Sequence, residues 1–381
     1  DELWHLVTGN RIPRSYNTNQ LDGNFSPISG REMMDQHGLY PWQADPINHP
    51  WKLIDPVSGY MFPTNDFGAY YESGLDEHGV FQPQLADRSL LVNELYPEKG
   101  PDWGVDDGFG WVDPETGDRY TFIAYYNHWH LWHGGIITSA LNAFKNAYIY
   151  TGDMKYARAG AVLLDRIADI YPTLDITQFD HNIYVNSHGG RPAGKAVGSI
   201  WETGLVKQLI EAYDVFYPVY DDPEVLQFLK QKGEQYNLPL KENATQIRRN
   251  IEDGILREIY PGMKASRIRG NNGFHQSALA MAAVVLDTLP ETKEWLDYNF
   301  QSGEAIGSVP YRITGGNILY SLVNDVDRDG HGNEASPGYN RLWLNNYIQA
   351  ADVLLGYDKY PDADLYENVK FRSMFRAMYP L

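Results

Sequence analysis

The sequence predicts an all-α fold, an incomplete α/α toroid of antiparallel helical hairpins behind a long irregular N-terminal segment. Three observations support this prediction. From about residue 122 onward, apolar residues recur at helical spacing over about 260 residues. Short turns containing Gly, Pro or Asp separate the helical segments, whereas strand patterns are weak throughout. No strict fixed-period repeat is present, which favours a toroid of divergent hairpins over a regular solenoid.

Residues 1–121 form the first predicted region, an irregular segment that wraps the helical body. Gly and Pro recur every few residues, and the helical period is almost absent. The segment contains the stretches His49-Pro-Trp-Lys52, Phe62-Pro-Thr-Asn-Asp-Phe67 and Val105-Asp-Asp-Gly108. A structureless stretch of this length is often functional in a compact protein, so we expect it to supply part of a cleft wall.

The second predicted region, residues 122–381, is a series of helical hairpins that would carry the functional site. Thr151-Gly152-Asp153 is typical of one helix ending and the next beginning, so residues 122–150 and 154–171 should form the first hairpin. Pro172, Pro218 and Pro261 are expected to end the helices before them. The remaining predicted helices cover residues 197–217, 222–232, 242–260, 274–288, 292–300, 338–355 and 365–378.

Composition excludes several functions. The net charge of −19 argues against a general nucleic-acid binder, which needs a basic face. No apolar run is long enough to span a membrane, and the absence of cysteine excludes disulfides and thiolate chemistry. The chain begins at Asp1 without Met, which is typical of a processed or trimmed protein. The 28 Tyr and 10 Trp could stack on sugar rings or anchor loops, and the sequence leaves both open.

The first polar cluster, Arg267 to Gln276, precedes a strongly apolar helical segment. It contains Arg267, Arg269, Asn271, Asn272, His275 and Gln276. Asn271 or Asn272 could simply cap that helix. Arginine can also bind a carboxylate, and Asn or His can hydrogen-bond a carboxylate that is being converted to an enolate. So many polar groups beside a core helix favour a binding role.

The second polar cluster, Glu334-Ala-Ser-Pro-Gly-Tyr339-Asn-Arg341, lies at the start of another predicted helix. Ser336 as N-cap with Pro337 in the first turn is typical of a helix start. Tyr339 could pack inward as an ordinary helix aromatic. In the first turn, with Arg341 two residues later, it is also suitably placed for acid–base catalysis.

Three weaker motifs complete the candidates. Asp325, Asp327 and Asp329 match the first half of a calcium loop, but Ser336 replaces the glutamate at the twelfth position, so a solvated turn is favoured over a metal site. The stretch from Tyr126 to His133 lacks the spacing of a zinc helix and predicts aromatic cleft lining, with His130 as a substrate contact. A Gly-rich basic loop with His188 and Arg191 leads toward Trp201 and Glu202, and all four are candidate ligand contacts.

The two polar clusters resemble those of the heparinase II/III-like superfamily of polysaccharide lyases. The similarity rests on Gly270-Asn271-Asn272-Gly-Phe-His275-Gln276 and Asp329-Gly-His-Gly-Asn-Glu334-Ala-Ser-Pro-Gly-Tyr339. It extends loosely to Trp51-Lys52, residues 62–67 and Val105-Asp-Asp-Gly108. The resemblance implies an α/α toroid, normally followed by an antiparallel β-sandwich domain that is absent from this sequence and would lie in a missing part or a second chain.

The resemblance also implies an activity, β-elimination of uronic-acid polysaccharides such as glycosaminoglycans or alginate. Asn271 or Asn272, with His275, would neutralise the uronate carboxylate, and Tyr339 would move the proton. Arg267, Arg269, Gln276, His188 and Arg341 would contact the anionic polymer. The chemistry requires no cofactor, although a divalent metal stays possible, and a periplasmic or secreted location is expected. No nucleic-acid or membrane partner is expected.

Three other functions stay open on the sequence. An α/α-toroid glycoside hydrolase would need two carboxylates across a cleft, and Asp106, Asp107, Glu202 and Glu334 are available. A uronate C5-epimerase would share the proton abstraction of the lyase and differ in the fate of the resulting carbanion. A non-catalytic glycan-binding protein would bind oligosaccharide without turnover.

Overall fold

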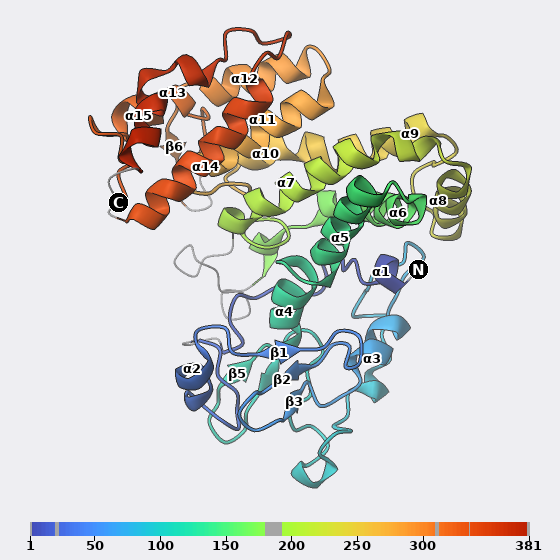
Figure 1. The fold of residues 1–381 in the computed structure, drawn as a ribbon. Helices are drawn as coiled ribbons and strands as arrows, with labels where there is room; N and C mark the ends of the chain where they lie inside the picture. The colour runs from blue at the N-terminus through green and yellow to red at the C-terminus, as the bar shows by residue number, and fades with distance from the viewer. Residues whose placement is uncertain (1, 20–22, 180–192, 309–311, 335, 379–381) are drawn as a thin grey trace. The chain divides into compact units, whose positions relative to one another are not determined.

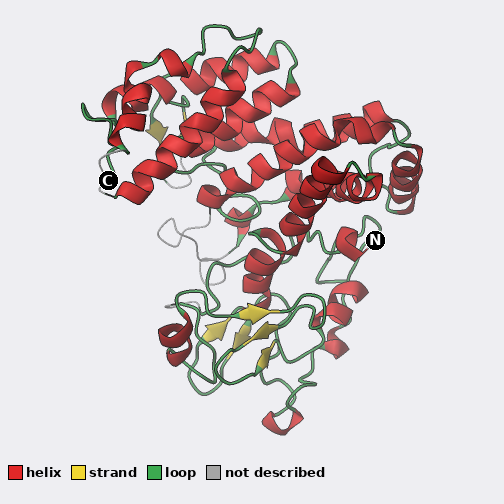
Figure 2. Ribbon diagram, in the orientation of Figure 1, coloured by secondary structure: helices red, strands yellow, loops and turns green. Residues whose placement is uncertain are grey.

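The computed structural model describes residues 2–19, 23–179, 193–308, 312–334 and 336–378. It is 53% helix and 6% strand, so the all-α class predicted from the sequence is confirmed at this level (Figures 1 and 2). The chain forms two compact units, residues 1–197 with 218–250 and residues 198–217 with 251–381. The boundary predicted at residue 121 lies within the first unit.

The first 120 residues of the first unit contain short elements around a core of aromatic side chains. Phe62 and Phe122 stack with ring centres 4.6 Å apart, and Trp42 and Tyr120 pack on Phe122. These rings are buried, so for them loop anchoring, and not sugar stacking, is the role that the structure shows. The helices are α1 (Glu2–His5), α2 (Glu32–His37) and α3 (Phe67–Ser73), with 3₁₀ turns η1 (Arg88–Leu90) and η2 (Pro97–Lys99).

Two small antiparallel sheets lie in the same region, and each strand has two residues. The strands β1 (Gln43–Ala44), β2 (Leu53–Ile54) and β3 (Met61–Phe62) pair in that order, and β4 (Trp111–Val112) pairs with β5 (Arg119–Tyr120). Asp106 holds the adjoining loop: its buried carboxylate accepts N–H bonds from Gly108, Gly110 and Ile123 at 2.7–3.0 Å. Burial nevertheless raises the pKa of Asp106 to about 6. Through Asp106, the Val105-Asp-Asp-Gly108 motif therefore stabilises this loop.

The helix predicted over residues 122–150 is interrupted, and this part of the prediction is wrong. The chain forms α4 (Phe122–Tyr126), a π-helical segment η3 (Asn127–Trp132) and α5 (Ile136–Thr151). The break follows from Gly134, whose φ is +69°, and from Gly135, where a Cβ would lie 2.3 Å from the backbone of His130. The predicted turn after α5 is confirmed, since Gly152 is left-handed and Asp153 caps α6 (Met154–Ile170).

His130 lies in this π-helical segment, and its Nε2 is buried without a hydrogen-bond partner in the described part of the chain. Burial lowers the pKa of His130 to about 4. Because the folded-state pKa lies below the ordinary value, the associated stability is present above pH about 6.5 and lost as the pH falls toward 4. We therefore expect His130→Phe to gain about 3 kcal/mol relative to wild type between pH 7 and 4. Urea unfolding at both pH values measures this difference, and a constant difference would contradict the assignment.

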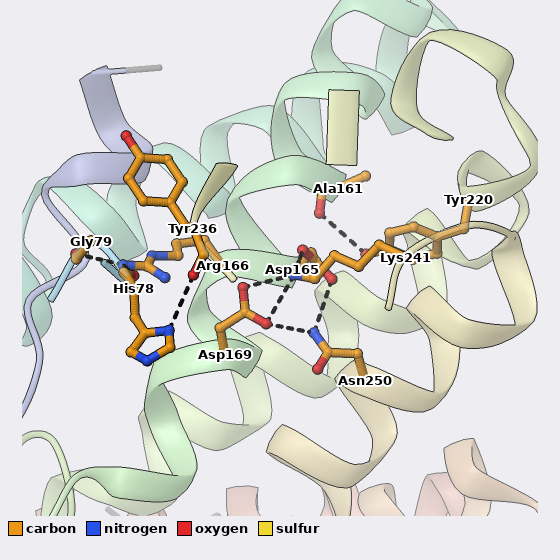
Figure 3. A network of polar contacts seen from close by, with 10 residues as sticks. All are labelled: His78, Gly79, Ala161, Asp165, Arg166, Asp169, Tyr220, Tyr236, Lys241 and Asn250. Carbon is orange, nitrogen blue, oxygen red and sulfur yellow. Dashed lines mark hydrogen bonds and ion pairs between the residues drawn. The ribbon is translucent and has the colours of Figure 1, made fainter. Parts of the chain in front are cut away.

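The helices α5 and α6 pack together as the predicted hairpin, and α6 also packs against α8 (Pro223–Gln235). A buried ionic network lies on α6 (Figure 3). Lys241 donates to Asp165 and, at 2.7 Å, to Asp169, and Asn250 of α9 (Ala244–Ile251) donates to both carboxylates. The two carboxylates are four residues apart and share one side of α6. The unit also contains the 3₁₀ turns η4 (Tyr171–Thr173) and η5 (Ile176–Gln178) and most of η6 (Tyr217–Asp221).

The second unit is organised around α11 (Phe274–Leu286), whose residues are almost all buried. It packs against α7 (Ser199–Phe216), α10 (Arg257–Lys264), α12 (Glu291–Phe300) and α14 (Pro337–Leu354). Its small residues (Ser277, Ala278, Ala280, Ala282 and Ala283) allow the neighbouring helices to approach closely. The other elements are the π-helical η7 (Glu252–Leu256), α13 (Ile318–Asn324), η8 (Leu365–Glu367), α15 (Val369–Ala377) and the paired strands β6 (Ala305–Ile306) and β7 (Arg312–Ile313).

Two predicted features of this unit are wrong. The helix expected over residues 242–260 is divided by η7, and it does not stop at Pro261, which lies inside α10. Proline removes one backbone hydrogen bond from α10. Packing of the buried residues Ile259, Gly262 and Met263 stabilises the helix despite that loss. The short helix α13 was not predicted, because its seven residues give too few repeats of the helical period.

Candidate functional site

The first polar cluster lies immediately before α11. Gly273 is the N-cap residue, with φ +92°, so the expectation that Asn271 or Asn272 caps this helix is wrong. A Cβ at residue 273 would stand 2.9 Å from the Cβ of Asn346 and 3.0 Å from the carbonyl oxygen of Trp343, both on α14. The start of α11 therefore lies directly against α14, and glycine is required for this contact as well as for the backbone conformation.

Carboxylates of the same unit hold both asparagine amides. Asn271 Nδ2 donates to Glu334 Oε1 at 2.7 Å, and Asn272 Nδ2 donates to Asp325 Oδ2 at 3.0 Å. The same Glu334 oxygen accepts from Trp343 Nε1 at 3.2 Å. Because an amide nitrogen carries two hydrogens, each asparagine keeps one N–H for another acceptor. The structure thus brings the two polar clusters together through Glu334.

His275 is buried, with 5% of its surface exposed. Burial lowers its pKa to about 3, with a further contribution from the neighbouring Arg269 and Lys207 charges. Its Nδ1 lies 3.2 Å from the carbonyl oxygen of Gly270, which can only accept, so Nδ1 carries the hydrogen. The imidazole is therefore neutral and presents Nε2 as an acceptor. Donation from His275 to a carboxylate would require the ring to be protonated.

Tyr339 lies in the first turn of α14, after Ser336 and Pro337 as predicted. It is 48% exposed, and its phenol makes no hydrogen bond within the described residues. Tyr339, Trp343 and Asn346 are spaced four and seven residues apart, so they form one row along α14. The helical rise places Tyr339 about 6 Å along the axis from Trp343, which shares Glu334 with Asn271.

The other predicted substrate contacts of this unit differ in how deeply they are buried. Gln276 is fully buried: its Oε1 accepts from Gly273 N, and its Nε2 donates to the Gly316 carbonyl, which is the pattern of a structural residue. Arg267 and Arg269 are half-buried, and burial lowers the pKa of Arg269. On α7, Trp201 is half-buried and Glu202 is buried, whereas Arg341 on α14 is exposed.

The remaining candidates lie elsewhere. His188 and Arg191 fall outside the described residues. His130 belongs to the first unit.

Hydrogen bonds from backbone N–H groups to an aspartate side chain stabilise the predicted turn at Asp325–Gly330. Asp327 Oδ1 accepts the N–H groups of Asp329 and His331 at 2.8 and 2.9 Å, and Asp325 accepts from Asn272. Lys370 caps the turn by donating to the carbonyl oxygens of residues 326 and 327. Within the ranges that the structure describes, no group of three or more acidic or histidine side chains is arranged to hold a metal ion.

One residue of the cluster was not predicted. Lys207 on α7 is 8% exposed, and it donates to Asn346 and, at 2.8 Å, to Gln349 of α14. Its partners are more than 130 residues away in sequence, so no local pattern could have indicated them. An interior helix position for lysine was the one available signal, because lysine is rarely buried.

In comparisons with known proteins, no family model, curated protein or solved structure matches the chain. Among the described residues, no helix combines the length and apolar character needed to cross a membrane.

Proposed function

We propose that the protein is a polysaccharide lyase that cleaves a uronic-acid-containing polymer of the glycosaminoglycan or alginate type by β-elimination. The observation that carries this proposal is the link from Asn271 through Glu334 to Trp343, one turn from Tyr339 on α14. It supports a site in which amide donors and a phenol act on one sugar ring. The enzyme would bind an anionic polysaccharide and require no cofactor.

In the proposed reaction, the remaining N–H groups of Asn271 and Asn272 hydrogen-bond the uronate carboxylate and stabilise the negative charge that develops on it. Tyr339 removes the proton from C5, the C4–O4 bond breaks as the C4–C5 double bond forms, and the leaving oxygen receives a proton from Tyr339. Tyr339 acts as the base in its deprotonated form, and its exposed position lets solvent take the phenol proton. Burial lowers the pKa of His275 to about 3, so its imidazole is too weak a base for that proton and is not assigned a proton transfer.

The proposal includes the α/α toroid architecture and the periplasmic or secreted location that the family resemblance implies. The hairpin of α5 with α6 and the packing of α11 among its neighbours are compatible with such a fold. Arg267, Arg269 and Arg341 would supply positive charge for an anionic polymer on an otherwise acidic protein.

The test is an ultraviolet absorbance assay for the conjugated C4–C5 double bond, run on alginate, hyaluronan, chondroitin, heparan and ulvan. We expect absorbance to rise with at least one polymer. No unsaturated product from any uronate polymer would contradict the proposed activity. Epimerised polymer without chain cleavage would identify a C5-epimerase instead.

The two asparagines can be separated by substitution. Asn271→Ala and Asn272→Ala should each lower kcat/KM by about one-hundred- to one-thousand-fold, because one donor to the developing charge is lost while the other remains. Initial rates of double-bond formation give the values, and thermal unfolding checks that the fold is intact. Full activity in both variants would remove the amides from the mechanism.

A further inference from the structure

Lys207 is a buried titratable group that the proposed reaction does not use. Its Nζ donates to Oδ1 of Asn346 and Oε1 of Gln349, and it stands 5.8 Å from the ring centre of Phe274, the first residue of α11. One amine therefore joins α7, α11 and α14 beside the segment that carries Asn271, Asn272 and His275.

The partners of Lys207 differ from those of Lys241, the buried lysine of the first unit. Lys241 lies between two aspartates, which outweigh the effect of burial and raise its pKa (Figure 3). Lys207 has two neutral amide oxygens, which satisfy the two N–H groups of an uncharged amine. An ammonium group would carry a third N–H, and no carboxylate of the described residues forms an ion pair with it. Burial accordingly lowers the pKa of Lys207 to about 7.

The side chains that accept hydrogen bonds from the Lys207 amine carry no negative charge. Glu211, one turn later on α7, opposes the fall in pKa, while His275 on α11 is itself affected by the charge on Lys207. The contacts on α14 are uncharged. In η7, which packs against α7 and α11, Glu252 accepts from Tyr213 and pairs with Arg257. A carboxylate from a bound ligand would add a second negative charge to that of Glu211.

We infer that Lys207 is the proton-linked cation of this site: its amine is only partly charged in the free protein at neutral pH and takes up a proton from solvent when the substrate carboxylate binds at Asn271 and Asn272. The inference rests on the proposed carboxylate site and adds a residue to it. Lys207 acts on the ligand through its charge and through the start of α11, and it is not assigned a contact with the sugar. Proton binding by Lys207 and carboxylate binding at the asparagines then strengthen each other by the same factor.

The experiment is an NMR titration of the full chain labelled with ¹³C at lysine Cε, with the Lys207 signal assigned by its loss in Lys207→Arg. In the free protein we expect a midpoint near pH 7, about three units below ordinary lysines. Saturating methyl glucuronide should raise this midpoint by about one unit, which corresponds to about ten-fold tighter binding by the charged form. Methyl glucoside, the neutral match, should leave it unchanged.

Variants provide an independent measurement. Glucuronide affinity of the wild type should fall by about ten-fold as the pH rises from about 6 to 9. Lys207→Arg stays charged, so its affinity should stay high and flat over that range, and Lys207→Met should be low and flat. Lys293→Met, an exposed lysine of the same unit, should behave as wild type. If Lys207→Met does not fold, the NMR titration of the wild type and the pH dependence of glucuronide affinity in Lys207→Arg still test the inference.

The outcomes separate this inference from the lyase proposal. A Lys207 midpoint near that of ordinary lysines, no binding of glucuronide, or a midpoint that glucuronide does not move would each overturn the inference. A glucuronide-dependent shift in a protein that produces no unsaturated sugar would support the carboxylate site and contradict the elimination chemistry alone.

Discussion

Replacing Tyr339 with phenylalanine should lower kcat on the uronate polymer by about 10²- to 10⁴-fold, the usual contribution of a group that transfers a proton. The substitution removes one oxygen from a side chain that is 48% exposed and that forms no hydrogen bond within the described residues. The free energy of unfolding should therefore change little. Initial rates of double-bond formation measure the loss, and substrate affinity should be nearly unchanged because the amides that bind the carboxylate remain.

Tyr320 offers a matched control. It lies on α13 of the same unit, is 49% exposed, and is not part of the proposed site. Tyr320→Phe should keep wild-type kcat, so that a loss confined to residue 339 reports the phenol and not a general effect of removing a hydroxyl group. Near-normal turnover by Tyr339→Phe would transfer the base role to another group, and the hydrolase alternative would gain if Glu202→Gln abolished activity instead.

Lys241→Met should destabilise the first unit by about 3–5 kcal/mol, the usual cost of leaving a buried charge without its partner. Lys241, Asp165 and Asp169 have side chains that are 0–2% exposed, so water cannot replace the lost ammonium group (Figure 3). Burial already raises the pKa of Asp165 to about 6 with the lysine in place. Chemical denaturation near neutral pH gives the change in the free energy of unfolding.

A surface pair provides the comparison for this effect. Lys293 and Asp297 form an ion pair on α12 whose side chains are 59% and 51% exposed. Lys293→Met should cost less than about 1 kcal/mol, because solvent already screens that pair. Adding Asp169→Asn to Lys241→Met should recover part of the stability, since it removes one uncompensated carboxylate. Equal, small effects at both lysines would show that water reaches the buried network.

Local patterns predicted the helical class and several element boundaries. The turn at Gly152-Asp153, the proline start of α14 and the helix α11 all depend on neighbouring residues, and the structure confirms them. The interruption after Tyr126 was not visible, because the apolar residues of η3 continue the helical pattern while the backbone changes its hydrogen bonding. Pro261 was misjudged because tertiary packing of its helix outweighs one lost bond.

The candidate site was predictable where its residues are close in sequence. Asn271, Asn272, His275 and Tyr339 were identified by local motifs, but their partners were not. Glu334 is 63 residues from Asn271, and the hydrogen bond between them depends on how the helices pack. The neutral state of His275 likewise depends on burial, and the structural use of Gln276 depends on Gly316. Residue types indicate possible chemistry, whereas protonation states require the folded protein.

The division of the chain into units has a consequence for biosynthesis. The chain passes between units after residues 197, 217 and 250, so α7 is synthesised before the last part of the first unit. Its partners α11 and α14 are synthesised later, and the amide that Lys207 binds on α14 is 139 residues downstream. On the ribosome, α7 must therefore emerge before α11 and α14, and its contacts with them can form only after those helices have been synthesised. Neither unit can be expressed as one continuous fragment without losing a segment of its core.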